Sequence, residues 1–228
     1  YEAEQGVSGG GAVARTASDF DAAKTASEAS NRQYVALPSN GSYVQWTVSQ
    51  TAAGVTLRFT LPDNAAGTGV AGSLGVFVNG VLATTISPGS YWAWTYFVTT
   101  DPRNTPGTRP RMRFDEIHFR LTTALKPGDV LKIAKTNGDA YEYGIDFVEI
   151  EAVPDALAKP AGFVSVTDYG ANGADNVSDS AAFDNAWAAA KVKKTGMYIP
   201  SGKFVLSRKW NLGDSTGVAI QGAGVWYT

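Results

Sequence analysis

The region 163–228 constrains the fold most, because it joins one helical pattern to short strands at close spacing. Four apolar residues at helical spacing predict one buried helix face: Phe183, Ala186, Trp187 and Ala190. Short strands with glycine-containing turns follow this helix, at 197–200, 203–206 and 218–222. Because such a rhythm of strand and turn normally repeats, we expect 163–228 to begin a longer repetitive fold.

The ends of the predicted helix carry capping signals. Ser178 or Asp179 is expected to cap the first turn by accepting hydrogen bonds from its free backbone N–H groups. Three lysines near the other end, at 191, 193 and 194, suit the helix C-terminus, where the dipole favours cations. Gly196 is then expected to end the helix.

The region 1–152 contains only strand patterns, which predict an antiparallel β-sandwich or barrel. Of the two we expect the sandwich, of the jelly-roll type. Its apolar or alternating runs lie at 44–48, 55–61, 76–82, 117–121, 130–134 and 145–150. Asn79-Gly80 stands between two apolar runs and predicts a type I′ hairpin, because both turn residues must take positive φ. A linker, 153–162, with small residues and a proline towards each end, separates the sandwich from 163–228.

The overall composition excludes several classes of function. A net charge of -2 gives no electrostatic reason to bind nucleic acid or an anionic membrane. No apolar run approaches the roughly 20 residues of a membrane span. With no cysteine, the chain can form neither a disulfide nor a thiolate metal site. We expect a monomer with no nucleic-acid or membrane partner.

Three carboxylates are predicted to meet at one end of the sandwich. Glu2 and Glu4 occupy alternate positions of an expected first strand, so both should point to one face. Asp146 lies in the expected last strand. Three such groups would repel one another unless a hard cation such as calcium held them. Spacing alone favours the alternative that they are ordinary solvated carboxylates.

The opening Tyr-Glu-Ala-Glu and the closing Gly-Ile-Asp-Phe-Val-Glu-Ile at 144–150 resemble the carbohydrate-binding β-sandwiches of families 6 and 35. Those modules hold a structural calcium with the glutamates of the opening motif, an aspartate of the closing strand and main-chain oxygens. The resemblance thus implies calcium on Glu2, Glu4 and Asp146, with a main-chain ligand around 22–30.

Two aromatic stretches are candidates for sugar binding, because pyranose faces stack on rings and their hydroxyls need amide or carboxylate partners. The candidate residues are Tyr91, Trp92, Trp94, Asn137, Asp139, Tyr141 and Tyr143. About half of the aromatics in 91–97 are instead expected to point into the core. Related modules often bind sugar through an Asn just before the closing Ile-Asp pair, and Gly144 stands there in this chain, so that cleft is expected to be empty or altered.

Two other features do not indicate a catalytic site. The segment 99–116 contains three prolines and is too long for a hairpin turn, so we expect it to pack against a neighbouring domain or to form a binding loop. His118, the sole histidine, lies in an alternating strand without a Ser or Cys partner nearby and is expected to be structural.

The region 163–228 resembles the start of pectate-lyase-like right-handed parallel β-helices. The resemblance rests on Asp-Tyr-Gly-Ala at 168–171, a polar loop at 172–177, Asp-Ser-Ala-Ala-Phe at 179–183 and Tyr-Ile-Pro-Ser-Gly-Lys-Phe at 198–204. The helix of those proteins caps the open end of the solenoid. Behind a carbohydrate-binding sandwich, the ending Gln-Gly-Ala-Gly-Val-Trp-Tyr-Thr is similar to bacterial α-1,3-glucanases and mycodextranases of glycoside hydrolase family 87. This resemblance implies a secreted hydrolase of a neutral α-glucan that cuts internal α-1,3 bonds.

Glycoside hydrolysis needs paired carboxylic acids, but no catalytic residue is assigned within 1–228. The carboxylates of the second region all have an expected role in a turn, cap or helix: Asp168, Asp175, Asp179, Asp184 and Asp214. We expect the acids on middle coils of the β-helix, beyond residue 228, so the remainder of that β-helix is an expected partner. The alternatives are a non-catalytic binding or adhesion module and a pectin-active β-helix enzyme.

Overall fold

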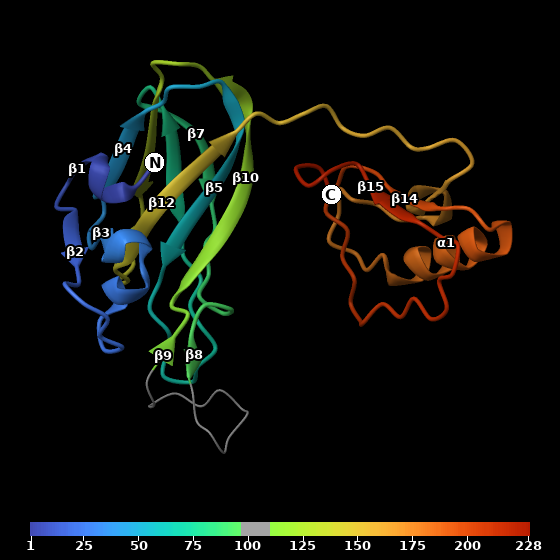
Figure 1. Ribbon diagram of the computed structural model, residues 1–228, viewed down its shortest axis with the longest axis horizontal. Coiled ribbons are helices and arrows are strands. Elements are labelled where there is room, and N and C mark those ends of the chain that lie inside the picture. The colour runs from blue at the N-terminus through green and yellow to red at the C-terminus, as the bar shows by residue number, and fades with distance from the viewer. Residues whose placement is uncertain (97–109) are drawn as a thin grey trace. The chain divides into compact units, whose positions relative to one another are not determined.

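The computed structural model describes residues 1–96 and 110–228. The chain divides into two compact units, Tyr1–Ala152 and Val153–Thr228 (Figure 1). Most of the proline-rich segment 99–116, and Phe97 of the first aromatic stretch, lie outside the described residues. Within the described part, no helix is long and apolar enough to cross a membrane.

Two five-stranded antiparallel sheets form the first unit, which confirms the predicted sandwich (Figure 1). Sheet I has the order β1 (Val7–Gly9), β4 (Tyr43–Thr47), β11 (Val130–Lys135), β6 (Leu74–Val78) and β7 (Val81–Ile86). Sheet II has the order β10 (Phe114–Leu125), β5 (Ala52–Thr60), β12 (Tyr143–Glu151), β3 (Gln33–Leu37) and β2 (Val13–Thr16). A two-stranded ribbon, β8 (Thr95–Tyr96) with β9 (Pro110–Arg111), completes the unit.

The alternation of apolar and polar residues in the sequence matches the alternation of buried and outward-facing side chains in the strands. In β4, Val44 and Trp46 are buried between the sheets, while Gln45 and Thr47 face outwards. Asn79 and Gly80 turn β6 into β7 with φ values of 51° and 81°, which confirms the predicted hairpin.

The amino terminus differs from the expected first strand. Ala3–Gln5 form a 3₁₀ turn, η1, and Glu2 makes a single bridge to Phe147 of β12. The prediction that Glu2 and Glu4 occupy alternate strand positions is therefore wrong. Two more 3₁₀ turns, η2 (Thr25–Glu28) and η3 (Ser30–Arg32), precede β3.

A three-stranded parallel sheet organises the second unit, as expected for the start of a parallel β-helix. Its strands are β13 (Val164–Ser165), β14 (Met197–Ile199) and β15 (Ile220–Gly222), with the 3₁₀ turn η4 (Val166–Tyr169) after β13. Val164 lies beside Met197, and Met197 beside Ile220, so each strand begins at the same level of the stack.

The one α-helix of this unit, α1 (Ser180–Lys193), buries the predicted face. Its four apolar residues, Phe183, Ala186, Trp187 and Ala190, all belong to one core with Val164 and Met197. The helix ends earlier than expected, because Lys194 takes the left-handed conformation at φ 48°. Gly196 has a different role: a Cβ there would lie 2.1 Å from the Phe163 ring, so only glycine fits.

The linker 153–162 belongs to the second unit. The backbone N–H of Leu157 donates to the Ala223 carbonyl at 2.8 Å. Two tyrosine hydroxyls donate to linker carbonyls, Tyr198 to Leu157 at 2.6 Å and Tyr227 to Pro154 at 2.7 Å. The linker is therefore held along the second unit by these hydrogen bonds.

Candidate functional site

Three carboxylates come together beside the 3₁₀ turns, although the backbone path differs from the predicted one. The backbone N–H of Ser30 donates to both oxygens of Asp146, at 2.9 and 3.1 Å. The Ser30 hydroxyl donates to Glu2 at 3.0 Å, and the Asn31 side-chain amide donates to Glu4 at 3.4 Å. The segment 22–30, expected to supply a main-chain ligand, thus ends at these acids.

Asp146 is fully buried within this group. Burial, helped by the nearby charges of Glu2 and Glu4, raises the pKa of Asp146 to about 6, although the Ser30 N–H and Arg58 act in the opposite direction. One Arg58 nitrogen lies 3.2 Å from an Asp146 oxygen, and another donates to the Glu28 carbonyl at 3.2 Å. Arg58 therefore neutralises part of the acidic charge.

The donor set partly fits calcium, which prefers carboxylate and carbonyl oxygens. One oxygen of Glu2 and one of Glu4 are buried without a hydrogen-bond partner in the described part of the chain, and such orphaned acceptors are costly. Three carboxylates and one guanidinium leave a formal charge of about -2, which a divalent cation would balance. Among residues 1–96 and 110–228, however, no three acidic, His or Cys side chains already form an arrangement that could hold a metal.

Of the first aromatic stretch, two side chains are mostly exposed to solvent and one lines a hollow. Tyr91 and Trp92 are 61% and 81% exposed and pack edge to face on each other. Ala93 between them and Trp94 is buried. The Trp94 indole donates to the Leu61 carbonyl at 2.7 Å, and its ring stacks on Tyr96 at a centroid distance of 6.3 Å.

Trp94 and Tyr141 line the same hollow of about 330 Å³ at one end of sheet II. Its other lining residues are Thr25, Tyr34, Thr60, Leu61, Pro62, Ala140, Glu142 and Gly144. Glu142 pairs with Arg15 at 2.7 Å, with both side chains partly exposed. Two half-buried rings beside a carboxylate and a guanidinium provide stacking faces and polar partners for a small polar ligand.

Gly144 is closed to any larger side chain. A Cβ there would lie 2.5 Å from Thr60 and 2.8 Å from the Tyr34 ring. Thr60 and the Tyr34 ring therefore leave no room for a side chain at this position. The hollow has an aromatic wall but no side-chain amide from residue 144.

Three other sugar-site candidates belong to a buried polar network instead. Tyr143 is fully buried, and its hydroxyl donates to Asp139 and accepts from the Ser73 backbone N–H at 3.0 Å. The Asn137 amide donates to the Ser73 carbonyl at 3.0 Å and to the Tyr143 hydroxyl at 3.1 Å. The ring of Tyr143 has no face open to a sugar, and the polar groups of Asn137 and Asp139 already have protein partners.

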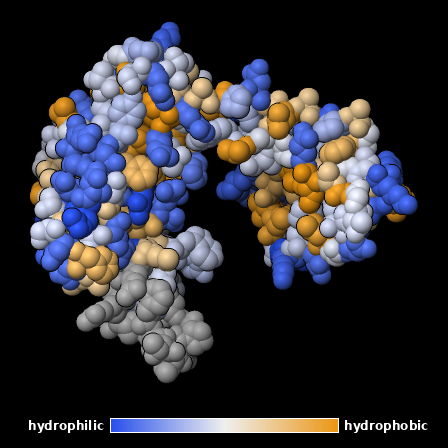
Figure 2. Space-filling view, viewed as in Figure 1, coloured by the Kyte–Doolittle hydropathy of each residue, from blue (hydrophilic) through white to orange (hydrophobic). Residues whose placement is uncertain are grey.

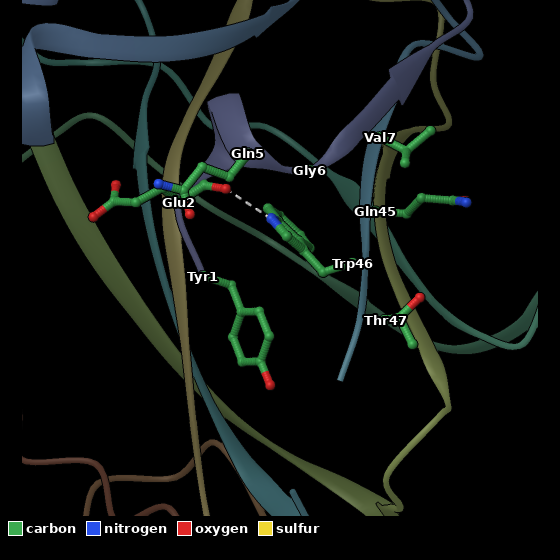
Figure 3. A pocket seen from close by; sticks show the side chains of 8 residues that line it. All are labelled: Tyr1, Glu2, Gln5, Gly6, Val7, Gln45, Trp46 and Thr47. Carbon is green, nitrogen blue, oxygen red and sulfur yellow. Dashed lines mark hydrogen bonds between the residues drawn. The ribbon is translucent and has the colours of Figure 1, made fainter. Parts of the chain in front are cut away.

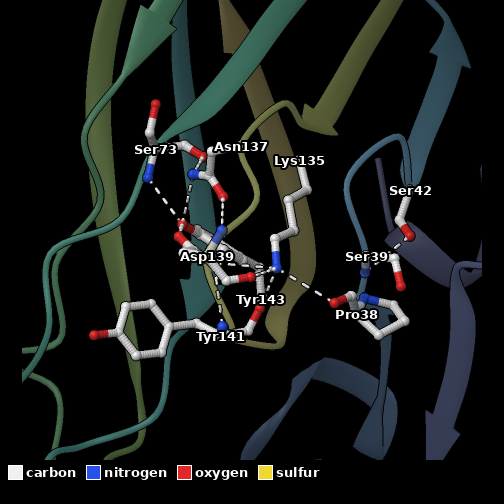
Figure 4. Close-up of polar contacts among 9 residues, drawn as sticks. All are labelled: Pro38, Ser39, Ser42, Ser73, Lys135, Asn137, Asp139, Tyr141 and Tyr143. Atoms are coloured by element: carbon white, nitrogen blue, oxygen red, sulfur yellow. Dashed lines mark hydrogen bonds and ion pairs between the residues drawn. The ribbon is translucent and has the colours of Figure 1, made fainter.

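Lys135 lies at the centre of this network and was missed from the sequence (Figure 4). Its buried ammonium donates to the carbonyls of Pro38, Asp139 and Tyr141 at 3.3, 2.8 and 2.6 Å, and lies 3.1 Å from the Asp139 carboxylate. Burial opposes the charge of Asp139, but hydrogen bonds from Tyr143 and Lys135 outweigh it and lower the pKa of that carboxyl. Lys135 continues the core-facing series of Leu131 and Ile133, and that parity was the available signal.

The carboxylates of the second unit have structural partners, as expected. Asp168 belongs to a capping box with Ser165, and Asp184 forms an ion pair with Arg208. Asp175 and Asp214 accept backbone N–H groups within their own turns. Asp179 does not cap α1 with its side chain and instead accepts from the backbones of Asn172 and Val205, both at 2.8 Å.

Each of the two units matches a known protein family. Residues 1–153 match the family described as α-1,3-glucanase catalytic domain D1, and 163–228 match the rhamnogalacturonase A/epimerase, pectate lyase-like family. No curated protein sequence matches.

Several solved structures cover the whole chain. The Agl-KA catalytic domain is 49% identical with a TM-score of 0.95. The catalytic unit of a thermostable glycoside hydrolase family 87 α-1,3-glucanase from Streptomyces thermodiastaticus is 30% identical with a TM-score of 0.79. A family 87 α-1,3-glucanase catalytic domain in complex with nigerose is 25% identical with a TM-score of 0.72. The chain spans 41%, 38% and 39% of these three structures.

Proposed function

Because the chain belongs to the α-1,3-glucanases of glycoside hydrolase family 87, we propose that it is the polysaccharide-binding part and first coil of a secreted enzyme that cuts internal α-1,3 bonds of a neutral α-glucan. The observation that carries the proposal is the succession, in one chain, of a D1-type sandwich and a parallel β-helix start. A relative of the same family has been crystallised with nigerose, an α-1,3-linked glucose disaccharide.

In this proposal, the paired acids of hydrolysis lie outside residues 1–228. Each carboxylate of 163–228 is explained by a turn, cap or ion pair, and the chain spans about two fifths of its relatives. Inverting and retaining glycosidases both need two carboxyl groups facing one bond. Further coils of the β-helix are the proposed source of these acids.

Exposed apolar groups on the second unit support stacking of a further coil. Ile220 of β15 is 40% exposed, and Val225 just after it is 86% exposed. Figure 2 shows hydrophobic atoms gathered on this unit. Patches of this kind normally mark an interaction surface, and a next rung of the same β-helix is the proposed occupant.

The hollow at Trp94 and Tyr141 is the proposed polysaccharide site of the sandwich. Trp94→Ala and Tyr141→Ala are each expected to weaken retention of the chain on insoluble α-1,3-glucan by about tenfold, because each removes a stacking face worth ~1.4 kcal/mol. Depletion binding assays measure this, and a full-length enzyme containing the chain should release oligosaccharides from the same polymer.

The matched control is Phe20→Ala, which removes a 65% exposed ring that does not line the hollow. Equal retention of the Trp94, Tyr141 and Phe20 variants would show that the hollow does not bind glucan. Release of oligosaccharides from pectin, with none from α-1,3-glucan, would instead contradict the proposed substrate.

Calcium at Glu2, Glu4 and Asp146 is the second part of the proposal, supported by the two orphaned carboxylate oxygens. Free calcium at about 100 times its Kd should raise the melting temperature of the sandwich by roughly 5–10 °C over a chelated sample. Glu4→Gln should reduce this shift, whereas Glu149→Gln, an exposed carboxylate of the same β12 strand as Asp146, should not. An identical melting temperature with calcium and with chelator would leave Ser30 and Arg58 as the partners of these acids.

A further inference from the structure

Arg113 is a buried cation that belongs neither to the acidic group nor to the lining of the Trp94 hollow. It is 2% exposed and lies between the short strand β9 and the start of β10. Its Nε and Nη2 atoms donate to one oxygen of Glu28 at 3.2 and 2.9 Å, and its backbone N–H donates to the other oxygen at 2.8 Å. Because both carboxylate oxygens are engaged by one residue, the geometry of this ion pair is fixed.

The same guanidinium holds both ends of the 3₁₀ turn η2. Glu28 is the last residue of η2, and Nη2 of Arg113 also donates at 3.0 Å to the carbonyl of Lys24, which directly precedes the turn. Within the turn, the Ser27 N–H donates to the Lys24 carbonyl at 3.1 Å, and no side chain caps its start. A 3₁₀ turn of this length has weak hydrogen bonds of its own and depends on contacts from outside. Arg113 supplies such contacts.

The first residue of η2 lines the proposed polysaccharide site. Thr25 belongs to the same hollow as Trp94. Its hydroxyl forms no hydrogen bond to any of the residues that the structure describes, so it remains available to a ligand. The strand β8, which directly follows Trp94, pairs with β9, and β9 ends shortly before Arg113. Arg113 therefore joins the segment that carries Thr25 to the segment that carries Trp94.

The chain just after η2 is anchored without Arg113. The Ser30 N–H donates to both oxygens of Asp146 at 2.9 and 3.1 Å, and the Ser30 hydroxyl donates to Glu2 at 3.0 Å. The backbone of Glu2 is itself fixed, because its carbonyl accepts from the Trp46 indole at 2.8 Å, the bond drawn in Figure 3. Loss of the Arg113 contacts would therefore release the start of η2, at Thr25, and leave the chain beyond its end in place.

We propose that Arg113 is a positioning residue for polysaccharide binding, which holds η2 so that the Thr25 hydroxyl stays in the wall of the Trp94 hollow. The inference rests on the proposed function of that hollow. For stability alone a buried ion pair has little advantage, because an apolar pair of similar volume is often as stable. The planar fork of arginine adds direction, since it fixes the Glu28 carboxylate and the Lys24 carbonyl together. A wall fixed in advance lowers the ordering cost of binding a ligand.

Glu28→Gln is the first test, because it retains an oxygen for the Arg113 backbone N–H and removes the charge that the guanidinium binds. Retention of the 228-residue chain on insoluble α-1,3-glucan should fall about three- to tenfold, the loss expected for about one hydrogen bond. Hydrogen exchange should become faster at the Ser27 amide within η2 and remain unchanged at the Ser30 amide beyond it.

The double variant Glu28→Gln/Arg113→Met separates positioning from stability. It leaves no unpaired buried charge, so the melting temperature of the sandwich should rise from that of Glu28→Gln towards that of the wild-type chain. Its retention on glucan should remain about three- to tenfold low, because the start of η2 has lost the guanidinium. Recovery of retention together with the melting temperature would show that the ion pair only stabilises the fold, and would overturn the inference. Exchange that becomes equally fast at Ser27 and Ser30 would overturn it too.

Arg32→Met is the matched control, since Arg32 is an exposed arginine on the neighbouring turn η3. It should change neither retention nor exchange at Ser27. Full retention of the Glu28→Gln chain, with the wild-type chain retained, would contradict the role of Arg113 and leave the proposed function standing. A wild-type chain that is not retained on α-1,3-glucan would contradict the proposed function and this inference with it.

Discussion

Replacing Lys135 by methionine is expected to lower the free energy of unfolding of the sandwich by about 3–5 kcal/mol, the cost of breaking a buried ion pair on one side. The change leaves the Asp139 carboxylate without its cation. It also leaves the carbonyls of Pro38, Asp139 and Tyr141 without the donor they share. Methionine has a similar volume, so the loss comes from the polar partners rather than from a cavity.

Lys132→Met is the matched control, since Lys132 lies on the same strand but points to the outer face, where its ammonium contacts the rings of Tyr43 and Phe77. That contact is worth about 1 kcal/mol or less. Hydrogen exchange of the β11 amides in urea measures both variants and reports on the sandwich alone. Equal losses for Lys135→Met and Lys132→Met would show that the buried network contributes little.

The pH dependence provides a second readout of this pair. The pKa of Asp139 is held below its ordinary value in the folded chain, so its contribution is fully present above the unfolded pKa of about 4 and is lost as the pH falls further. Lys135→Met removes one of the groups that lower this pKa. The difference in stability between the two proteins should therefore narrow below about pH 4.

Alternation predicted the sandwich well, because one face of each strand is buried and a period of two is then obligatory. It worked for Val44 and Trp46, which are buried, and for Gln45 and Thr47, which face outwards. The same parity places Tyr143 beside Ile145 in the core, so the prediction of Tyr143 as a sugar-binding residue disagreed with the strand pattern. The residue type alone suggested an exposed, sugar-binding tyrosine, but Tyr143 is packed in the core.

Loop paths were the part that the sequence could not provide. The meeting of Glu2 and Glu4 with Asp146 depends on a 3₁₀ turn and on Ser30, neither of which has a strong local signal. The carbonyl groups around Lys135 come from two different loops, and their positions follow from the packing of strands far apart in the sequence. Polar sites built from backbone carbonyls therefore could not be predicted from the sequence, whereas strands with an alternating side-chain pattern could.

The second large effect is expected at Asp179, one of the two residues, with Ser178, that the sequence predicted as the helix cap. Its side chain is 5% exposed and accepts backbone N–H groups from Asn172 and Val205. These hydrogen bonds connect the loop at Asn172 and the segment at Val205 to the start of α1. Asp179→Ala would leave two donors without their charged acceptor, and each such bond is worth about 1.5–3 kcal/mol.

Asp179→Ala should thus destabilise the second unit by about 3–5 kcal/mol, and Asp179→Asn by about half as much, since the amide retains one acceptor but turns N–H groups towards the other donor. Asp184→Ala is the control on the same helix, because its partly exposed pair with Arg208 should be worth less than 1 kcal/mol. Hydrogen exchange of the α1 amides measures all three. Phe183 and Trp187 of α1 pack into the core of the second unit. Faster exchange throughout α1 in Asp179→Ala would therefore show that this carboxylate keeps the helix packed on that core. An effect no larger than that of Asp184→Ala would show that apolar packing alone holds it.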